Sequence, residues 1–241
     1  MPTNKVVTHD KWLAARKKHL AKEKEFTRLR DQLSKERREL PWELLEKEYT
    51  FEGERGRQTL GEVFEGRNQL VIYHAMFKPE TAGPHTTWTT DAPCFVCSFW
   101  MDNFNGITVH LDRRDITMAA VSLAPYPKLA AYKKRMGWTF PWLSSIGSNF
   151  NFDYRVSFTP EELKADKVEY NYRMHPWSMS EGAGISVFIK DGGRIYHTYS
   201  TYARGLDMLN VAYHYMDLVP KGRDDGDAGA MWVRRRDEYR D

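Results

Sequence analysis

The distribution of hydrophobic and polar residues divides the chain into three parts. Residues 9–39 contain no Gly or Pro and carry sparse hydrophobic positions at approximate helical spacing, which predicts a long, mostly solvated helix. From residue 41 onward, hydrophobic runs alternate with amphipathic stretches, as expected of a folded domain. Residues 220–241 are polar again, and within them "KGRDDGDAGA" predicts a flexible linker and "MWVRRRDEYRD" a short terminal helix. We therefore expect a helical extension over 1–40, a domain over 41–219 and a polar tail over 220–241.

Strands and helices alternate within the domain. "KEYTFEGERGRQTL" predicts two strands joined by a turn, and "TLGEVFEG" predicts a short helix with a capping box between Thr59 and Glu62. "NQLVIYHAMF" and "RDITMAAVSLAP" predict buried central strands, followed by helices in "CFVCSFWMDNFNG" and "YPKLAAYKKRMG". "WTFPWLSS" predicts a short extended segment, "GISVFIKDGGRIYHTYSTY" a hairpin and "ARGLDMLN" a helix. This order predicts an α/β fold whose parallel sheet becomes mixed through the closing hairpin.

Charge and hydropathy argue against two classes of partner. The net charge of +3 is small for a nucleic-acid-binding protein, and the long helix mixes eleven Lys or Arg with six Asp or Glu. No stretch approaches 18 apolar residues, and the N-terminus lacks the hydrophobic centre of a signal peptide. We expect a cytoplasmic protein that binds neither nucleic acid nor membrane. The apolar stripe of the helix is expected to contact either the domain or a second subunit, and the second case predicts a homo-oligomer.

Both cysteines of the chain stand in "DAPCFVCSFW", three residues apart. If Cys94 lies in the first turn of a helix, the unpaired backbone N–H groups there favour its thiolate, and Cys97 can resolve a mixed disulfide formed at Cys94. One alternative is a pair of inert core residues. Another is a metal site that adds His74 and His85, although neither histidine has a recognisable zinc spacing. The preceding buried strand favours the redox interpretation over both, so we expect no metal.

Other polar side chains are candidates for the same site. His74 ends a central strand, where open α/β sheets bind ligands, and it is a candidate proton partner of Cys94 or else a structural histidine. His85, His197, Tyr199 and Arg204 are candidates for a substrate pocket. The alternative for the tyrosine-rich segment is a core edge or a dimer surface. Strand alternation predicts two faces there, Tyr196, Thr198 and Ser200 on one, His197, Tyr199 and Thr201 on the other. No phosphate-binding glycine loop is present, so we expect no organic cofactor.

The stretch from Phe51 to about Tyr202 resembles the thioredoxin superfamily, with the layout of the peroxiredoxin branch. "FEGERGRQTLGEVFEGRNQLVIYHAMF" is similar to the peroxiredoxin opening, and "GISVFIKDGGRIYHTY" to its last hairpin. The whole sequence resembles a bacterial thioredoxin-like family catalogued as domain of unknown function 899, through phrases such as "CSFWMDNFNG", "KRMGWTFPW" and "HTYSTYARGLDMLNVAYHYMDLVPKGRDD". This resemblance implies a thioredoxin-like fold with a helical N-terminal extension, and it brings no established activity.

Departures from the better-known relatives bear on activity. Pro93 stands where thioredoxins carry Trp before the first Cys, and Phe95-Val96 replaces their Gly-Pro. Gly184 stands where the cis-proline facing the cysteines is expected. Peroxiredoxins place a Thr three residues before the peroxidatic Cys, and that position is Asp91 for Cys94, or Cys94 itself for Cys97. Their Arg before the hairpin is also missing. These departures disfavour a peroxidase.

Two functional hypotheses follow. In the first, the chain is a thiol–disulfide oxidoreductase that acts on a protein or small-molecule thiol or disulfide. In the second, the thioredoxin scaffold is catalytically silent and serves as a binding or assembly module. Fold alone does not decide between them.

Overall fold

The computed structural model describes residues 4–239 and divides into two units, one ending at Trp42 and the other beginning at Glu43. The first unit contains helix α1 (His9–Arg38), which buries none of its side chains. Its apolar residues are widely spaced among charged ones, and Phe26 is 66% exposed. Ion pairs along the helix, such as Lys35 with Glu39, lie on its surface. The helix predicted over 9–39 is therefore confirmed.

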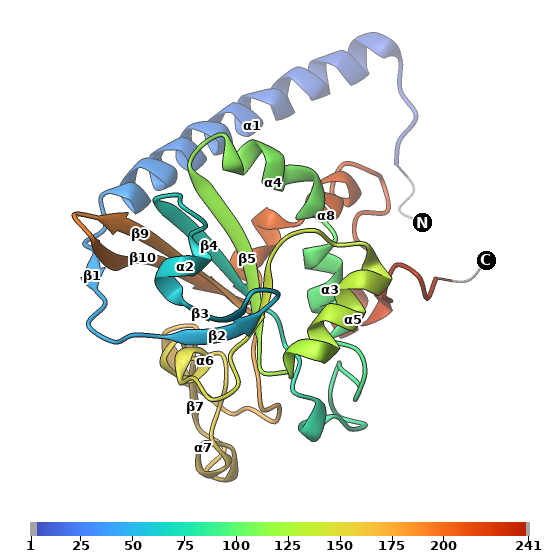
Figure 1. Ribbon diagram of the computed structural model, residues 1–241. Coiled ribbons are helices and arrows are strands. Elements are labelled where there is room, and N and C mark those ends of the chain that lie inside the picture. The colour runs from blue at the N-terminus through green and yellow to red at the C-terminus, as the bar shows by residue number, and fades with distance from the viewer. Residues whose placement is uncertain (1–3, 240–241) are drawn as a thin grey trace. The chain divides into compact units, whose positions relative to one another are not determined.

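The second unit is built on an eight-stranded mixed sheet, shown in Figure 1. In spatial order its strands are β1 (Glu43–Leu44), β10 (Arg194–Tyr202), β9 (Gly184–Asp191), β4 (Gln69–His74), β5 (Ile116–Ser122), β6 (Trp142–Ser144), β2 (Thr50–Gly53) and β3 (Gly56–Thr59). Among residues 4–239, only β4–β5 and β5–β6 pair in parallel. The helices are α2 (Leu60–Val63), α3 (Phe95–Met101), α4 (Asn105–Asp112), α5 (Tyr126–Met136), α6 (Phe150–Asp153), α7 (Pro160–Lys164) and α8 (Val211–Met216).

The connections between the four central strands identify the fold. β4 leads through α3 and α4 to its parallel neighbour β5. The hairpin β9–β10 then lies on the other side of β4, and both of its pairings are antiparallel. The thioredoxin-like fold predicted from the sequence is confirmed: a mixed sheet flanked by helices, with a long N-terminal helix.

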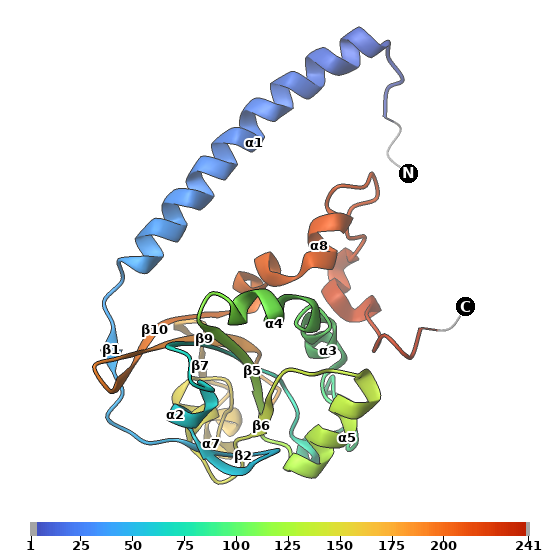
Figure 2. The same cartoon turned by 45° about the horizontal axis from the view of Figure 1, so that its top comes forward.

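Helices cover both faces of the sheet, and each face has its own hydrophobic core (Figures 1 and 2). One core joins side chains of α3, α5 and α8 to β4 and β5, and it contains Cys94 and Cys97. The other joins α2 and α6 to the opposite side of the same strands. Side chains alternate along β4, so Tyr73 lies in the first core and Ile72 in the second.

The local signals in the sequence correspond to the observed elements. The capping box of α2 forms, since the Thr59 hydroxyl accepts the backbone N–H of Glu62 and the Glu62 carboxylate accepts that of Thr59. The segment "ARGLDMLN" is a 3₁₀ helix, η2 (Ala203–Leu209), instead of an α-helix. A two-stranded sheet of β7 (Val168–Tyr170) and β8 (Arg173–His175) occupies a region that the sequence left unassigned. A shorter 3₁₀ helix, η1 (Pro79–Thr81), follows β4.

The polar C-terminal segment is part of the second unit and packs on it. After the 3₁₀ helix η3 (Gly226–Trp232), Val233 is completely buried, and Arg235 is 7% exposed. The segment predicted as a flexible linker differs from the structure, because Arg223 pairs with Asp207 and Asp217 and the segment runs into η3. Among the residues described, the predicted terminal helix is limited to the end of η3, and the ion pair of Arg135 with Asp237 joins the residues after it to α5. None of the helices among residues 4–239 combines the length and hydrophobicity that crossing a membrane requires.

Candidate functional site

The two cysteines lie at the beginning of α3, where the loop after β4 meets the helix. Cys94 is the N-cap residue, and its sulfur accepts the backbone N–H of Cys97 at 3.3 Å. The backbone N–H of Cys94 donates to the carbonyl of Met76 at 3.0 Å, and the N–H of Met76 reaches the Cys97 sulfur at 3.4 Å. The helix start predicted at Cys94 is therefore confirmed, and β4 positions both sulfurs through Met76.

The surroundings of the two thiols give them different acidities. Burial alone would raise the pKa of Cys94, but hydrogen bonds from Cys97, Thr87 and the backbone N–H groups of Cys97 and Val96 hold it below its ordinary value. Burial raises the pKa of Cys97 well above its ordinary value, and the neighbouring Cys94 adds to this effect. Cys94 is thus the more acidic thiol of the pair, and Cys97 donates a hydrogen bond to its sulfur.

Two hydroxyl groups that the sequence analysis missed flank the sulfurs. Tyr73, on β4, hydrogen-bonds to Cys97, and its buried phenol has a pKa well above the ordinary value because of desolvation. The buried Thr87 hydroxyl faces Cys94 and has no other hydrogen-bond partner among residues 4–239. Strand alternation carries a signal for Tyr73, since it faces away from His74; nothing in the sequence marks Thr87, which is brought in by a loop.

The C-terminal segment encloses the site. Arg235 donates from Nη2 to the carbonyl of Pro93 at 2.7 Å, immediately before Cys94. Trp232 packs edge-on against Phe99 of α3, and Figures 1 and 2 both show the red end of the chain beside α3. The exposed fractions of Cys94 and Cys97 are 0% and 1%. Solvent therefore reaches neither sulfur in this conformation.

His74 lies on the other face of the sheet from the cysteines, which corrects its predicted role as proton partner of Cys94. Its Nε2 is 2.9 Å from the Ser186 hydroxyl, and its ring stacks on Phe150 and Tyr154 of the second core. Burial lowers the pKa of His74 to about 3, so it is neutral at neutral pH. The period-two alternation of β4 dictates this placement, because Tyr73 and not His74 points toward α3.

The structure does not bring the four pocket candidates together with the cysteines. His85 is exposed in the loop before α3. His197 contacts the carboxylate of Glu43 at 3.1 Å, and Arg204 is exposed and pairs with Asp207. Tyr199 lies half-buried on β10. His197 lines a cavity of about 220 Å³ whose tyrosines are Tyr49, Tyr154, Tyr172 and Tyr202.

A bulge in β10 changes the predicted faces of this strand. His197 pairs with Phe188, but Tyr199 pairs with Val187, so the register shifts between them. As a result, His197 and Ser200 lie on one face and share a hydrogen bond of 2.8 Å, although strict alternation predicts opposite faces. The sequence carries no marker for this bulge.

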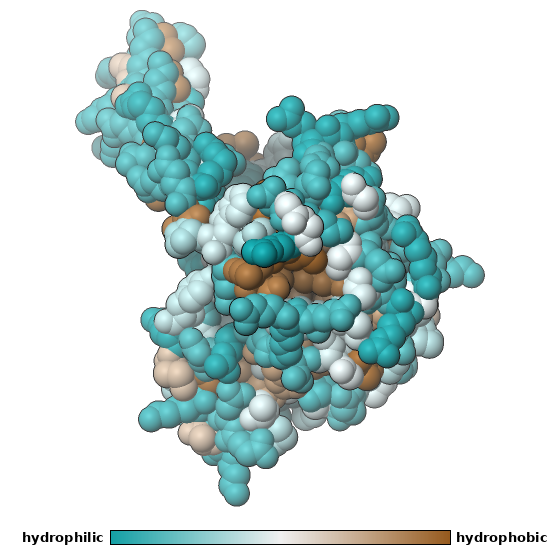
Figure 3. Space-filling view, turned by 60° about the vertical axis from the view of Figure 1, so that its left-hand side comes forward, coloured by the Kyte–Doolittle hydropathy of each residue, from teal (hydrophilic) through white to brown (hydrophobic). Residues whose placement is uncertain are grey.

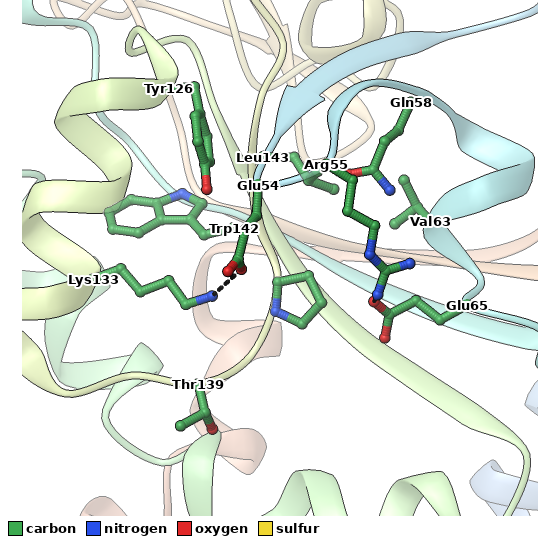
Figure 4. Close-up of a pocket in the computed structure, with 11 residues that line it drawn as sticks. Glu54, Arg55, Gln58, Val63, Glu65, Tyr126, Lys133, Thr139, Trp142 and Leu143 are labelled. Atoms are coloured by element: carbon green, nitrogen blue, oxygen red, sulfur yellow. Dashed lines mark hydrogen bonds and ion pairs between the residues drawn. The ribbon is translucent and has the colours of Figure 1, made fainter.

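Among the other cavities of the second unit, one of about 640 Å³ contains a predicted site residue, Arg204, beside Trp100 and Tyr213. Two further cavities contain none of the predicted site residues. Figure 4 shows one of about 200 Å³, where Lys133 of α5 points toward Glu54 and Arg55 pairs with Glu65. Figure 3 shows a hydrophobic recess between hydrophilic side chains on another face of the molecule. A cavity of about 570 Å³ lies beside β1, with Leu44, Leu45, Tyr49, Leu60 and Ile195 among its lining.

The placement of the histidines also bears on the zinc alternative. A zinc site would require His74 and His85 beside the two cysteines, but His74 lies on the other face of the sheet and His85 is exposed in the loop before α3. Within residues 4–239, no group of three or more His, Cys, Asp or Glu side chains is arranged to hold a metal ion.

Comparisons with known proteins complete this description. The curated proteins include no match to this chain. The solved structure of peroxidoxin BcpB from Mycobacterium tuberculosis is 12% identical, with a TM-score of 0.40, and the match covers 70% of this chain and 93% of that one. The bacterioferritin comigratory protein of Xanthomonas campestris is 14% identical, with a TM-score of 0.42 and coverages of 72% and 96%. The mitochondrial 2-Cys peroxiredoxin of Plasmodium falciparum is 11% identical, with a TM-score of 0.42 and coverages of 73% and 93%.

Similarities this low transfer no residue role to the present chain. A family model gives a broader match, since the one described as "Bacterial protein of unknown function (DUF899)" matches residues 1–239. This range includes α1, the sheet, the cysteine pair and the C-terminal segment that encloses it. The chain therefore belongs to the family of bacterial proteins of unknown function DUF899, as its sequence predicts.

Proposed function

We propose that this protein is a thiol–disulfide redox protein in which Cys94 is the attacking thiolate and Cys97 the resolving thiol. The observation that carries the proposal is the set of hydrogen bonds on the Cys94 sulfur, above all the 3.3 Å bond from the backbone N–H of Cys97. These donors stabilise the charged form of Cys94, which is the form that attacks a disulfide. Cys97 stays protonated until Cys94 has reacted, because its own pKa is raised.

The enclosure of the site favours a small-molecule disulfide over a folded protein as the oxidant. Neither sulfur is more than 1% exposed, and Arg235 closes the approach along Pro93. A compact molecule needs only a local opening of the C-terminal segment, whereas a protein disulfide needs the whole segment displaced. Local openings cost less free energy than removal of a packed segment. The cytoplasmic location and the absence of nucleic-acid partners stay predictions.

The proposal is tested by equilibrating the reduced chain with oxidised glutathione, followed by alkylation and mass measurement. The expected product is an intramolecular Cys94–Cys97 disulfide, which the mass identifies because the chain has no other cysteine. Cys97→Ser should stop at a mixed disulfide between Cys94 and glutathione. Cys94→Ser is the matched control and should react much more slowly, because the pKa of the remaining Cys97 thiol is raised. A wild-type chain that keeps both thiols reduced contradicts the proposal.

The same enclosure favours a second candidate, a catalytically silent binding module. In that case, the buried cysteines only fill the core between α3 and β4, and their replacement should affect packing alone. Oxidised glutathione separates the two functions. A binding module keeps both wild-type thiols reduced, and its Cys94→Ala/Cys97→Ala variant keeps the fold, whereas the redox protein forms the Cys94–Cys97 disulfide in the wild-type chain.

A further inference from the structure

Glu181 is a buried carboxyl group that the function proposed above does not yet use. Its exposed fraction is 1%, and it lies directly before β9. An isolated β-bridge sets Glu181 opposite Ser157, with the backbone N–H of Gly182 donating to Val156 at 2.9 Å. The segment is thus held by backbone hydrogen bonds, and its carboxyl group has a defined position.

The same stretch of backbone joins Glu181 to the cysteines. The N–H of Phe77 donates to the Glu181 carboxyl group, and Met76, one residue earlier, contacts both Cys94 and Cys97. Adjacent residues after β4, Met76 and Phe77, therefore contact the two sulfurs and the carboxyl group, and all three groups are buried. The second carboxyl oxygen, Oε2, has no hydrogen-bond partner within the part of the chain that the structure describes.

The surroundings of Glu181 favour its neutral form. Burial raises its pKa well above the ordinary range, and the negative charges of Cys94 and Glu80 raise it further. Lys78 acts in the opposite direction without reversing the shift. The surroundings thus favour the thiolate form of Cys94 and the protonated form of the Glu181 carboxyl group. The proton donor and the nucleophile are both buried and both contact the stretch Met76–Phe77.

We propose that Glu181 is the proton donor and acceptor of the Cys94–Cys97 pair, an inference that rests on the redox function proposed above. The substrate is a disulfide compound. The Cys94 thiolate attacks one of its sulfurs, the disulfide bond breaks, and Glu181 protonates the departing thiolate. The Glu181 carboxylate then takes the proton of Cys97.

The second half of the reaction follows from this transfer. The Cys97 thiolate attacks the Cys94 sulfur, and the second substrate thiolate leaves with the proton held by Glu181. The substrate is reduced to two thiols, while Cys94 and Cys97 are oxidised to a disulfide. The negative charge that began on Cys94 ends on Glu181, so charges and protons balance. General acid–base catalysis of this kind contributes a factor of roughly 10²–10⁴ to a rate.

The test compares Glu181→Gln with Glu80→Gln in the full-length chain, with oxidised glutathione as the probe. Gln keeps the size and the hydrogen bond from Phe77 but holds no transferable proton. We expect Glu181→Gln to close the Cys94–Cys97 disulfide roughly 10²-fold more slowly and to lose the pH dependence of this step. Glu80→Gln, the matched control, removes an exposed charge near the site but leaves the Glu181 carboxyl group in place. It should keep the pH dependence and close the disulfide at nearly the wild-type rate, with the profile displaced to lower pH because the charge of Glu80 raises the pKa of Glu181.

The wild-type chain supplies a readout that does not depend on folding of the variant. Disulfide closure should slow in D₂O, because a proton moves from Cys97 to Glu181 in that step, and Glu181→Asp should retain part of the pH dependence. A wild-type rate and pH profile in Glu181→Gln, or equal wild-type rates in H₂O and D₂O, overturns the role of Glu181 alone. A wild-type chain that forms no disulfide overturns the redox function as well, so the two failures are distinguishable.

Discussion

Arg235 joins the C-terminal segment to Pro93, the residue before Cys94, and its replacement by Ala gives a quantitative prediction. The guanidinium donates to the carbonyl of Pro93 at 2.7 Å and also pairs with Glu238, and its side chain is only 9% exposed. A hydrogen bond from a charged donor contributes about 1.5–3 kcal/mol net. If the C-terminal segment opens locally before Cys94 reacts, removal of this hydrogen bond lowers the free energy of opening by the same amount. Since about 1.4 kcal/mol corresponds to a factor of ten, the open population should rise about 10- to 150-fold.

The rate of Cys94 alkylation at neutral pH measures this opening directly. With a reagent slow enough for the segment to reclose between encounters, the alkylation rate follows the open population. Arg236→Ala is the matched control, because Arg236 is 49% exposed and pairs with Asp102 at 3.4 Å on the surface. Such a pair contributes about 0–1 kcal/mol. Equal alkylation rates for Arg235→Ala and wild type, or an equal acceleration by Arg236→Ala, would refute the reasoning.

Three further predictions concern stability. Burial lowers the pKa of His74 to about 3, so between pH 6.5 and about 3 the unfolded chain binds a proton at His74 and the native chain does not. Acidification therefore destabilises the wild type in this range, and His74→Phe should reduce that loss of stability. The difference should approach about 1.4 kcal/mol per pH unit in urea titrations, with the Ser186 hydroxyl still bonded to a neighbouring serine. Gly184→Ala should cost about 1–3 kcal/mol in the same assay, since an added Cβ would lie 2.6 Å from the ring of Tyr202. Thr59→Ala should cost about 1 kcal/mol through loss of the cap of α2.

Each of these predictions has a control in the same chain. His85→Gln changes an exposed histidine and should leave the pH dependence of stability unchanged. Gly83→Ala adds a Cβ with nothing within 4 Å and should be neutral. Thr59→Ser keeps the capping hydroxyl and should retain the stability of the wild type. If a control variant changed stability as much as its test variant, the physical cause given for that prediction would be wrong.

The sequence by itself determined the elements whose signals are local. The long helix from His9, the capping box at Thr59, the buried strand at Gln69–His74 and the helix start at Cys94 all depend on hydrogen bonds or packing between near neighbours in the chain. The order of strands and helices, together with the family resemblance, also predicts the thioredoxin-like fold.

Only the tertiary structure decided the composition of the site. Strand alternation places His74 and Tyr73 on opposite faces of β4, and Tyr73 is on the face of the cysteines. The sequence alone does not specify which of these two faces packs against α3. Glu181 and Arg235 reach the site from segments 87 and 141 residues beyond Cys94, and their burial there depends on long-range packing. The bulge at His197 likewise depends on how β10 pairs with β9. Local patterns therefore specify the scaffold and the nucleophile, whereas loop closure and chain packing select the groups that surround it.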